Sequence, residues 1–368
     1  MRSGRFSSAS KSDKQFWFNL PANFDLLDAC YRQYLWTDDD DYLAGEFLSF
    51  YRRTVISYVR RWSVGVGDVV GAGPHDGTRG IGSYNESIGG IRTGADLLAS
   101  EYRAFRSWAS IERALGEITG AAEAEIRAQR LRRLFDRDWW NDKDGRFFFA
   151  VGADGHFMHL NPASAGTMLS LPLYFGLVDP GAKTRQMLKL VARCMPLSEA
   201  NVDSLRDGLE TDTYLPDIYY RYGRSAAAYQ ALIALTDPGL YRRDYPEVSF
   251  TVVGNVATGL MGIGVEPSSG DLQTLPQLTG ETEWAFIQHV PVRANRISVR
   301  HDGNGRTWVR NGSGPPLRWR AGFSLGAGGL MIDGAPANVT ESLREGQVPR
   351  RYTVAVIPAG EESVVAVG

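Results

Sequence analysis

Residues 248–263 constrain the fold of this chain more than any other segment. The stretch begins at Val248 and ends at Ile263, and few polar residues interrupt it: Ser249, Thr251, Asn255 and Thr258. A helix that is apolar on every side must be surrounded by protein. Pro246 stands at a position that suits the first helical turn, and Glu247 follows it. The pattern therefore predicts an enclosed helix that carries a carboxylate at its opening end.

Other segments alternate between this enclosed type and the amphipathic type. Residues 167–178 are apolar around their circumference, while a stripe of apolar side chains marks one face of residues 42–62. Amphipathic patterns also cover residues 24–35, 95–115, 121–135, 183–193 and 215–233. Enclosed helices alternating with half-exposed ones are typical of two concentric rings. We expect a mainly α fold, an (α/α)6-type toroid, with too few helices to close the ring.

The pattern changes after Pro267, where short alternating runs separated by glycine turns predict strands. The runs are 296–300, 306–310, 317–323, 330–332, 352–357 and 363–367, with turns at 302–305 and Asn311-Gly312. They predict a small C-terminal β-sandwich domain. A hairpin is also expected over residues 146–160, turning at 153–155. The expected division is an irregular segment at 1–20, an α/α toroid at 21–265 and a β domain at 266–368.

Composition and net charge limit the classes of binding partner that we expect. The 368 residues are 43% hydrophobic, which supports a large core, and the formal net charge is only −2, so neither nucleic acid nor a charged membrane is an expected partner. Cys30 and Cys194 lie far apart, and His156 and His159 have an odd spacing on a hairpin, so we expect no metal site and no cofactor. No signal peptide or spanning segment is visible, which would place a complete chain in the cytoplasm. The opening resembles the middle of a domain, so we expect an N-terminal part to be missing.

Glu86 is the first candidate for chemistry. It follows Tyr84 and Asn85 in a glycine-rich stretch that leaves the backbone free to approach a ligand. The alternative is a purely structural role in a helix capping box, since Ser83 and Glu86 have the required spacing. Gly89-Gly90 weakens this alternative, because a helix should not meet paired glycines in its first turn.

Three further acids open helices. Glu247 is the second candidate, although an acid in a first turn stabilises the helix dipole in any case. Glu210 and Asp212 precede the expected helix at residues 215–233, where Asp212 or Thr213 is equally suited to be an N-cap. Glycoside hydrolysis needs a pair of carboxyl groups on opposite sides of the scissile bond, one as acid and one as base or nucleophile. A toroid would bring such acids together at one end of its inner ring.

Aromatic residues near these acids in the sequence are candidates for stacking on sugar rings. Trp139, Trp140 and Tyr214 are the ones we single out for substrate binding, together with Tyr84 and Asn85. The Tyr219-Tyr220 pair has the same potential. Aromatic side chains at helical spacing are more often part of a core, and this alternative stands beside the functional one.

The chain resembles the six-hairpin glycosidase superfamily of bacterial, rhamnosidase-like glycoside hydrolases. The resemblance is based on residues 24–30, 34–37, Ser83 to Glu86, Gly94 to Ala99 and Tyr245 to Phe250. The resemblance covers roughly residues 21–323 and implies an (α/α)6 toroid that hydrolyses a glycosidic bond with Glu or Asp as acid and base. It also implies that an N-terminal β-domain of such enzymes is absent here. The loop at residues 63–68 departs from the family because it is poor in acids, so a truncated chain would be inactive.

These observations predict a glycoside hydrolase acting on an oligo- or polysaccharide. Glu86 and Glu247 are the expected carboxyl pair, with Glu210 or Asp212 as substitutes. Two alternatives remain open from the sequence. One is a polysaccharide lyase on the same toroid that uses Tyr and His, and the other is a glycan-binding or scaffold protein without catalysis.

Overall fold

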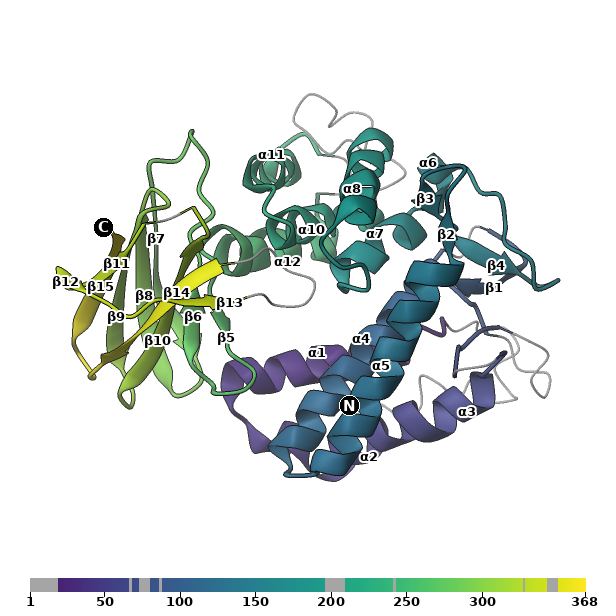
Figure 1. The fold of residues 1–368 in the computed structure, drawn as a ribbon, viewed down its shortest axis with the longest axis horizontal. Coiled ribbons are helices and arrows are strands. Elements are labelled where there is room, and N and C mark those ends of the chain that lie inside the picture. Colours follow the sequence, from purple (N-terminus) through teal and green to yellow (C-terminus); the bar gives the residue numbers. More distant parts are fainter. Residues whose placement is uncertain are drawn as a thin grey trace. The chain divides into compact units, whose positions relative to one another are not determined.

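The computed structural model describes residues 19–65, 68–72, 80–85, 88–195, 209–240, 243–326, 328–342 and 350–368. Two compact units divide the chain (Figure 1). The first comprises residues 1–34 and 39–196, and the second comprises residues 35–38 and 197–368. The second unit thus combines helices and sheets. The expected division at residues 20/21 and 265/266 stays a prediction.

Helices dominate the first unit, and two small strand pairs accompany them. The helices are α1 (Ala22–Thr37), η2 (Asp40–Leu43), α2 (Gly45–Arg52), η3 (Arg53–Tyr58), α3 (Val59–Trp62), α4 (Ala95–Ala114), α5 (Ile118–Asp138), α6 (Pro162–Ala165), α7 (Thr167–Tyr174) and α8 (Ala182–Cys194). The last residues of α1 belong to the second unit. Strand β1 (Ile91–Gly94) pairs with β4 (Ala150–Gly152), and β2 (Trp140–Asn141) pairs with β3 (Arg146–Phe147). The expected turn at residues 153–155 is present, because the Gly152 N–H donates to the carbonyl of His156.

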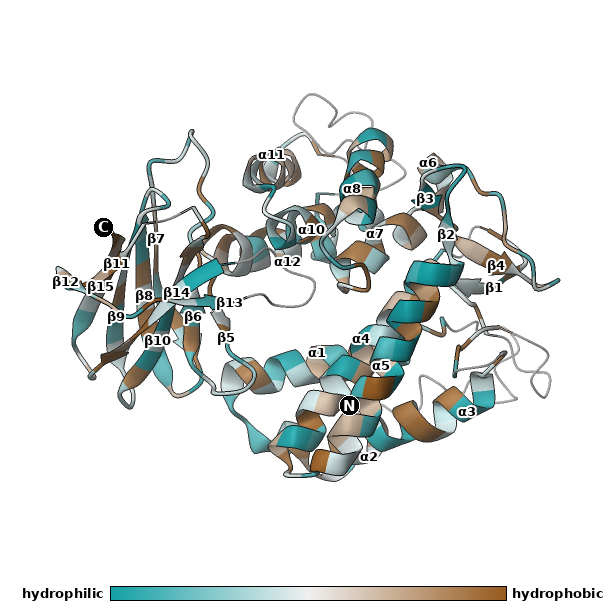
Figure 2. Cartoon of the chain, viewed as in Figure 1, coloured by the Kyte–Doolittle hydropathy of each residue, from teal (hydrophilic) through white to brown (hydrophobic). Residues whose placement is uncertain are grey.

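Helix α4 is the buried element of this unit. Most of its residues from Ala95 to Glu112 are buried, and it lies beside both α5 and α7 (Figure 1). The apolar segment predicted at residues 167–178 forms α7, whose residues 168–173 are all buried. Along α5 and α8 hydrophilic and hydrophobic residues alternate (Figure 2), as expected for helices with one solvent-exposed face.

The helices of the second unit are α9 (Leu209–Asp212), α10 (Leu215–Arg221), α11 (Ser225–Thr236), α12 (Pro246–Asn255) and η5 (Val256–Leu260). The prediction of one helix over residues 215–233 is wrong, because the chain breaks between α10 and α11. Gly223 has φ +68°, a left-handed conformation that glycine adopts readily, and the Arg224 N–H donates to the Tyr219 carbonyl.

The prediction that residues 248–263 are enclosed on every side is also wrong. Val248 and Asn255 are buried, whereas the side chains of Phe250 and Val253 are 73% and 71% exposed. Within this unit α12 packs on α10 and α11, which leave the side of Phe250 and Val253 uncovered. All-round hydrophobicity made the segment compatible with enclosure, but burial requires a partner on each side.

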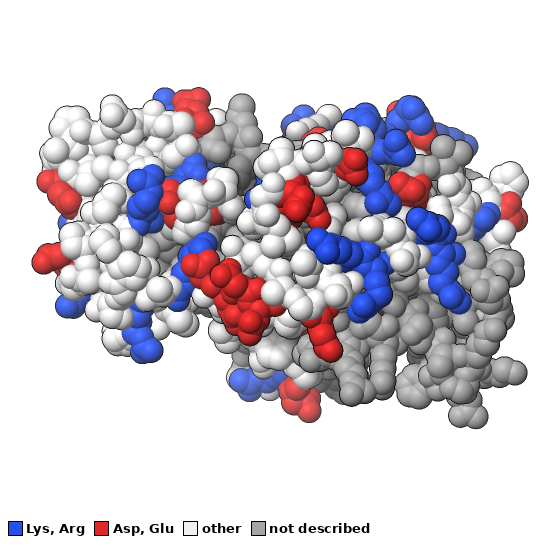
Figure 3. Space-filling model, turned by 90° about the horizontal axis from the view of Figure 1, so that it is seen from below, with Lys and Arg blue, Asp and Glu red and all other residues white. Residues whose placement is uncertain are grey.

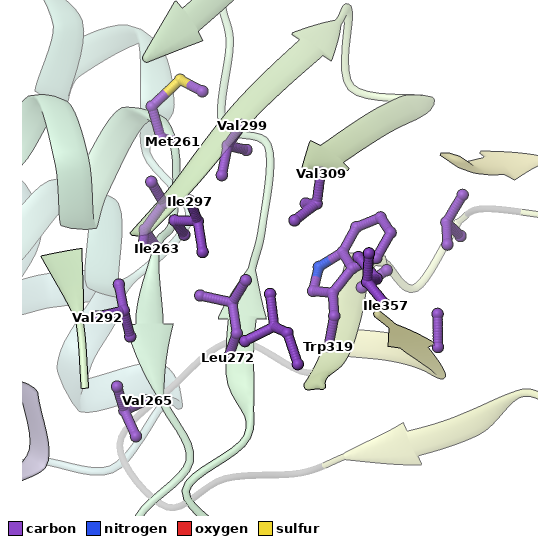
Figure 4. Packing of buried hydrophobic residues seen from close by; sticks show 14 of the residues in the cluster. Met261, Ile263, Val265, Leu272, Val292, Ile297, Val299, Val309, Trp319 and Ile357 are labelled. Atoms are coloured by element: carbon purple, nitrogen blue, oxygen red, sulfur yellow. The ribbon is translucent and has the colours of Figure 1, made fainter. Parts of the chain in front are cut away.

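Two sheets build the C-terminal part of the second unit. One has the strand order β13-β14-β10-β6-β5 and the other β12-β11-β15-β9-β8-β7. Their bounds are β5 (Gly264–Val265), β6 (Leu272–Thr274), β7 (Trp284–Val292), β8 (Asn295–Asp302), β9 (Arg306–Ser313), β10 (Leu317–Ser324), β11 (Leu330–Ile332), β12 (Ala335–Pro336), β13 (Thr340–Ser342), β14 (Arg350–Ile357) and β15 (Glu362–Val367). Side chains from both sheets share one core around Trp319, whose Nε1–H donates to Thr274 Oγ1 at 2.9 Å (Figure 4).

The six strands expected from residue 296 onward are confirmed, but the turn expected at Asn311-Gly312 is wrong. Both residues belong to β9, and the reversal follows at Gly314, where φ is +112°. Strand β7 was missed because Pro291 lies in it; proline argues against a central strand, and β7 is an edge strand.

The described residues contain no helix long and apolar enough to cross a bilayer. On the face drawn in Figure 3, basic and acidic side chains are interspersed with uncharged ones. This mixture agrees with the small net charge of −2.

His301 should make the stability of the second unit depend on pH. Burial lowers the pKa of this fully buried imidazole to about 4, although the Met261 carbonyl opposes the shift. The unfolded chain takes up a proton near the ordinary value of 6.5. The stabilisation is therefore fully present above pH 6.5 and is lost as the pH falls towards 4, by about 3 kcal/mol in total.

Urea unfolding of the wild type and of His301→Gln, measured at several pH values, checks this expectation. The difference in unfolding free energy between the two proteins should shrink as the pH falls from 6.5 to 4, because only the wild type loses this contribution. A constant difference across that range would contradict the assignment.

Candidate active site

Asp96, in the first turn of α4, is the most highly connected acid in the first unit. Its Oδ2 accepts hydrogen bonds from Ser83 Oγ at 2.7 Å, Thr167 Oγ1 at 2.8 Å and the Tyr84 N–H at 3.0 Å. Its Oδ1 accepts from the Leu97 N–H at 2.8 Å. Burial raises the pKa of Asp96 to about 6, even though the hydrogen bonds act in the opposite direction. One carboxylate therefore joins α4, α7 and the segment at residues 83–85.

Two glycines allow this segment to approach α4. A β-carbon at Gly94 would overlap Asp96 Oδ1, and one at Gly82 would overlap the carbonyl of Arg92. The Gly94 N–H donates to the Gly82 carbonyl at 2.6 Å. Larger residues at either position would push the segment away from its carboxylate.

Two further acids lie near the start of α1, and their environments differ. Burial would raise the pKa of Asp28, but Arg103 at 2.7 Å, Arg32 at 2.6 Å and a hydrogen bond from Ser107 bring it down to about 2. Asp25 lies three residues earlier on the same helix. Burial and the negative charge of Asp28 raise its pKa well above the ordinary value.

Asp96 also affects the pKa of Asp25. The charge of Asp96 contributes to the raised pKa of Asp25, so the two carboxyl groups are close enough to interact. Asp25 Oδ1 is buried and has no hydrogen-bond partner among the described residues, and the same holds for Asn23 Oδ1 on α1, the Tyr84 hydroxyl and Ser170 Oγ on α7. Buried polar atoms are normally paired, so these unpaired atoms make this part of the first unit a candidate functional region.

The structure describes some, but not all, of the site residues that the sequence predicts in the first unit. Glu86 lies outside the described residues. Tyr84 is held by Asp96, while the Asn85 N–H donates to Ser83 Oγ at 2.9 Å and its Nδ2 donates to the Ser164 carbonyl at 3.3 Å. Residues 81–85 are not helical, so Ser83 orders the loop instead of capping a helix.

Asp212, at the end of α9, is the most deeply buried of the sequence-predicted acids that the structure describes. The residue is only 5% exposed, and burial raises its pKa to about 7. No described residue forms a hydrogen bond or ion pair with its carboxyl group. Its charge helps to raise the pKa of the Tyr219 phenol to about 12, after the larger effect of burial. The N-cap of α10 is Tyr214, which has no side-chain cap, so neither Asp212 nor Thr213 has the capping role.

Glu247 and Glu210 are exposed. Glu247 is the second residue of α12, one turn before Thr251 on the same helix face. Thr251 Oγ1 donates to the Thr213 carbonyl at 3.1 Å, so this face of α12 meets the residue that follows Asp212. A second link holds the helix, since Asn255 Nδ2 donates to an Asp217 carboxylate oxygen on α10 at 2.7 Å.

The aromatic candidates divide between core and surface. Trp139 is 3% exposed and packs on Phe135 and Phe157, which favours the core alternative. Trp140 is half-buried, with Lys183 Nζ 5.2 Å from its ring centroid. Tyr214 is half-buried, whereas Tyr219 and Tyr220 are buried.

Sequence reasoning missed Asp25 and Asp96 as site residues. The signal was present, because each is an acid in the first turn of a helix whose neighbouring residues are apolar. A carboxylate that must be buried with its helix needs partners or a function. No group of three or more His, Cys, Asp or Glu within the described part of the chain is arranged to hold a metal ion.

Comparison with known proteins gives likeness of fold only. No family model matches the chain, and no curated protein matches it in sequence. A solved sialidase superposes with a TM-score of 0.55 at 14% identity, covering 89% of this chain and 32% of the sialidase. An α-L-rhamnosidase from Dictyoglumus thermophilum gives 0.54 at 14% identity, covering 94% and 39% of the two chains. A GH78 family rhamnosidase of Bacillus sp. GL1 gives 0.50 at 13% identity, covering 78% and 30%.

The chain thus spans only 30% to 39% of the length of these solved structures. Its helical body followed by a sheet-rich C-terminal region agrees with the rhamnosidase structures. At 13% to 14% identity the likeness does not extend to chemistry.

Replacing Asp96 with Asn should lower the unfolding free energy by about 1–3 kcal/mol, because an amide cannot accept all of the hydrogen bonds that the carboxylate accepts. Denaturant unfolding measures the change. Asp138→Asn is the matched control, since Asp138 is an exposed acid that pairs with Arg137 at the surface and should change stability by less than about 0.5 kcal/mol. Equal stability of the two variants would show that Asp96 does not hold the loop.

Proposed function

We propose that this chain hydrolyses a glycosidic bond in an oligo- or polysaccharide, with its helices forming an incomplete (α/α)6-type toroid and its two sheets a β-sandwich. The observation that carries the proposal is Asp212, a buried carboxyl group that has no partner among the described residues and whose pKa is about 7. The similar solved structures, which are named as rhamnosidases and a sialidase, support the same class of reaction.

Asp212 is the proton donor in this proposal. A general acid works best when its pKa lies near the working pH, because it is then still protonated but gives up its proton readily. The Asp212 carboxyl would pass its proton to the glycosidic oxygen as the bond to the anomeric carbon breaks. The burial that raises its pKa keeps it protonated until that moment.

Glu247 is the second carboxylate. An exposed position suits a base, which must remain ionised and accept a proton from water while that water adds to the anomeric carbon. It lies one turn before Thr251, whose hydroxyl contacts the carbonyl of Thr213, the residue after Asp212, and this supports a pairing of the two acids. Glu86 stays a predicted catalytic acid, and Glu210 a predicted substitute.

The segment held by Asp96 would contribute to binding in the first unit. Tyr84 and Asn85 are presented by hydrogen bonds to Asp96 and Ser83, so their backbone is ordered before a ligand arrives. Such preorganisation reduces the entropy lost on binding. Tyr214 and Trp140 are further predicted contacts for the sugar.

Asp212→Asn should reduce kcat for glycoside hydrolysis by about 10²–10⁴-fold, since general acid catalysis has this size. In the wild type, activity should fall as the pH rises above about 7, where Asp212 loses its proton. The residual activity of the variant should lack this alkaline decline. Release of reducing sugar from a panel of oligosaccharides, followed across neutral pH on both sides, measures both effects.

Asp217→Asn on α10 is the matched control for Asp212→Asn. Asp217 is also an acid of this helical region, but its carboxylate already accepts a hydrogen bond from Asn255 Nδ2. The control variant should therefore keep the pH profile of the wild type. Loss of the alkaline decline in Asp217→Asn as well would remove the case for Asp212 as the proton donor.

Glu247→Gln should lose turnover and retain sugar binding, because the amide cannot take a proton from water but has nearly the same shape. Parallel assays of hydrolysis and of oligosaccharide binding separate the two effects. If the wild type cleaves no oligosaccharide while it and the variants bind sugars equally, the chain is a glycan-binding protein and the proposal fails.

A further inference from the structure

A cavity in the first unit lies apart from all of the acids discussed above. Its volume is about 400 Å³, and it is lined by the turn between β2 and β3 and by one face of α8. The lining residues are Asp144, Gly145, Arg146, Gln186, Lys189, Leu190 and Arg193. A volume of this order falls within the range of small-molecule sites.

The cavity carries an excess of positive charge. Lys189 and Arg193 lie four residues apart on α8, an arrangement in which like charges repel and destabilise a helix slightly. Neither forms a hydrogen bond or ion pair with any described residue. Arg193 in the last turn is favourable for the helix dipole, but this does not explain Lys189 one turn earlier.

The opposite wall is ordered before any ligand binds. Arg146 Nη2 contacts Asp144 Oδ2 at 3.2 Å, and its guanidinium lies 4.9 Å from the centroid of the Phe149 ring. Asn141 Nδ2 donates to Asp144 Oδ2 at 3.0 Å, while its Oδ1 accepts from the Lys143 N–H at 3.1 Å. These contacts fix the turn, so Arg146 is held in place and Asp144 is already paired.

We propose that this cavity binds an acidic sugar residue, one that carries a carboxylate or a sulfate ester. Lys189 and Arg193 would contact the oxyanion, since both cations lack a partner within the described structure. The Gln186 amide and the Asp144 carboxylate suit hydroxyl groups, which both donate and accept hydrogen bonds. Arg146 and Asn141 engage Asp144 Oδ2, which leaves Oδ1 to accept from a hydroxyl group. A carboxylate in the wall disfavours a bare inorganic anion, and Leu190 offers an apolar surface to the ring.

This inference deepens the proposed function by naming a substrate class, and it rests on that function. The cavity would hold an acidic residue of the glycan and thereby select anionic polysaccharides. Binding can be measured without turnover, so failure here and failure of the hydrolase proposal are distinguishable.

Isothermal titration calorimetry of the full chain with four probes tests the assignment. The probes are a glucuronate-containing oligosaccharide, a sulfated oligosaccharide, a neutral oligosaccharide of the same length and inorganic sulfate. At least one acidic oligosaccharide should bind at least tenfold more tightly than the neutral one and more tightly than inorganic sulfate. Its affinity should fall with added salt, and which acidic probe binds better identifies the anionic group.

The double variant Lys189→Met/Arg193→Met should lose this preference at least tenfold. Arg185→Met is the control, because Arg185 is an exposed cation on the same helix that does not line the cavity. Equal affinity for the neutral probe, equal affinity for inorganic sulfate, or no binding of either acidic probe would each overturn the proposal. So would loss of the preference in Arg185→Met alone.

Discussion

The buried carboxylate of Asp96 is the interaction on which the first unit depends most. Removing a carboxylate from water costs several kcal/mol, and the donors of α4, α7 and the 83–85 segment offset this cost together. Three separate parts of the chain must therefore reach one point for any of them to be stable there. This requirement helps to order the loop, which also bonds through the Ile81 and Gly82 carbonyls and through Asn85 Nδ2.

The pKa of each buried acid in this protein depends on the charges and hydrogen bonds around its carboxyl group. Asp28 has two arginines and a serine hydroxyl, and its pKa falls to about 2. Asp25 lies one turn away without such partners, and burial raises its pKa. Asp212, buried and without a described partner, is near 7. An acid that is paired with cations, as Asp28 is, stays ionised at neutral pH, whereas burial without a cation beside the carboxyl group raises its pKa.

The basic side chains of the cavity beside α8 show the same contrast between paired and unpaired groups. Arg146 is satisfied by Asp144, whereas Lys189 and Arg193 have no described partner. In each case the side chains left without a partner are the ones available to a ligand. The proposed hydrolytic site and the cavity are thus both inferred from side chains that have no partner among the described residues.

Much of the secondary structure was predictable, because its signals are local. Helix α4 and strand β11 follow from hydrophobic period and turn chemistry alone. The break at Gly223 was missed because a glycine continues or ends a helix depending on its tertiary contacts. Among the acids, Asp212 was a sequence-predicted candidate because it lies near a helix end, whereas Asp25 and Asp96 were not singled out although each lies in the first turn of a helix.

The sequence by itself determined where helices give way to strands, since the period of the apolar residues changes near Pro267. It also placed acids near helix ends, such as Glu247 in the first turn of α12. Only the tertiary structure decided which of them are buried, and hence which have a raised pKa, because burial depends on residues distant in the chain. The same reason explains α12: its apolar residues were visible from the sequence, but the exposure of Phe250 was set by how few neighbours surround the helix.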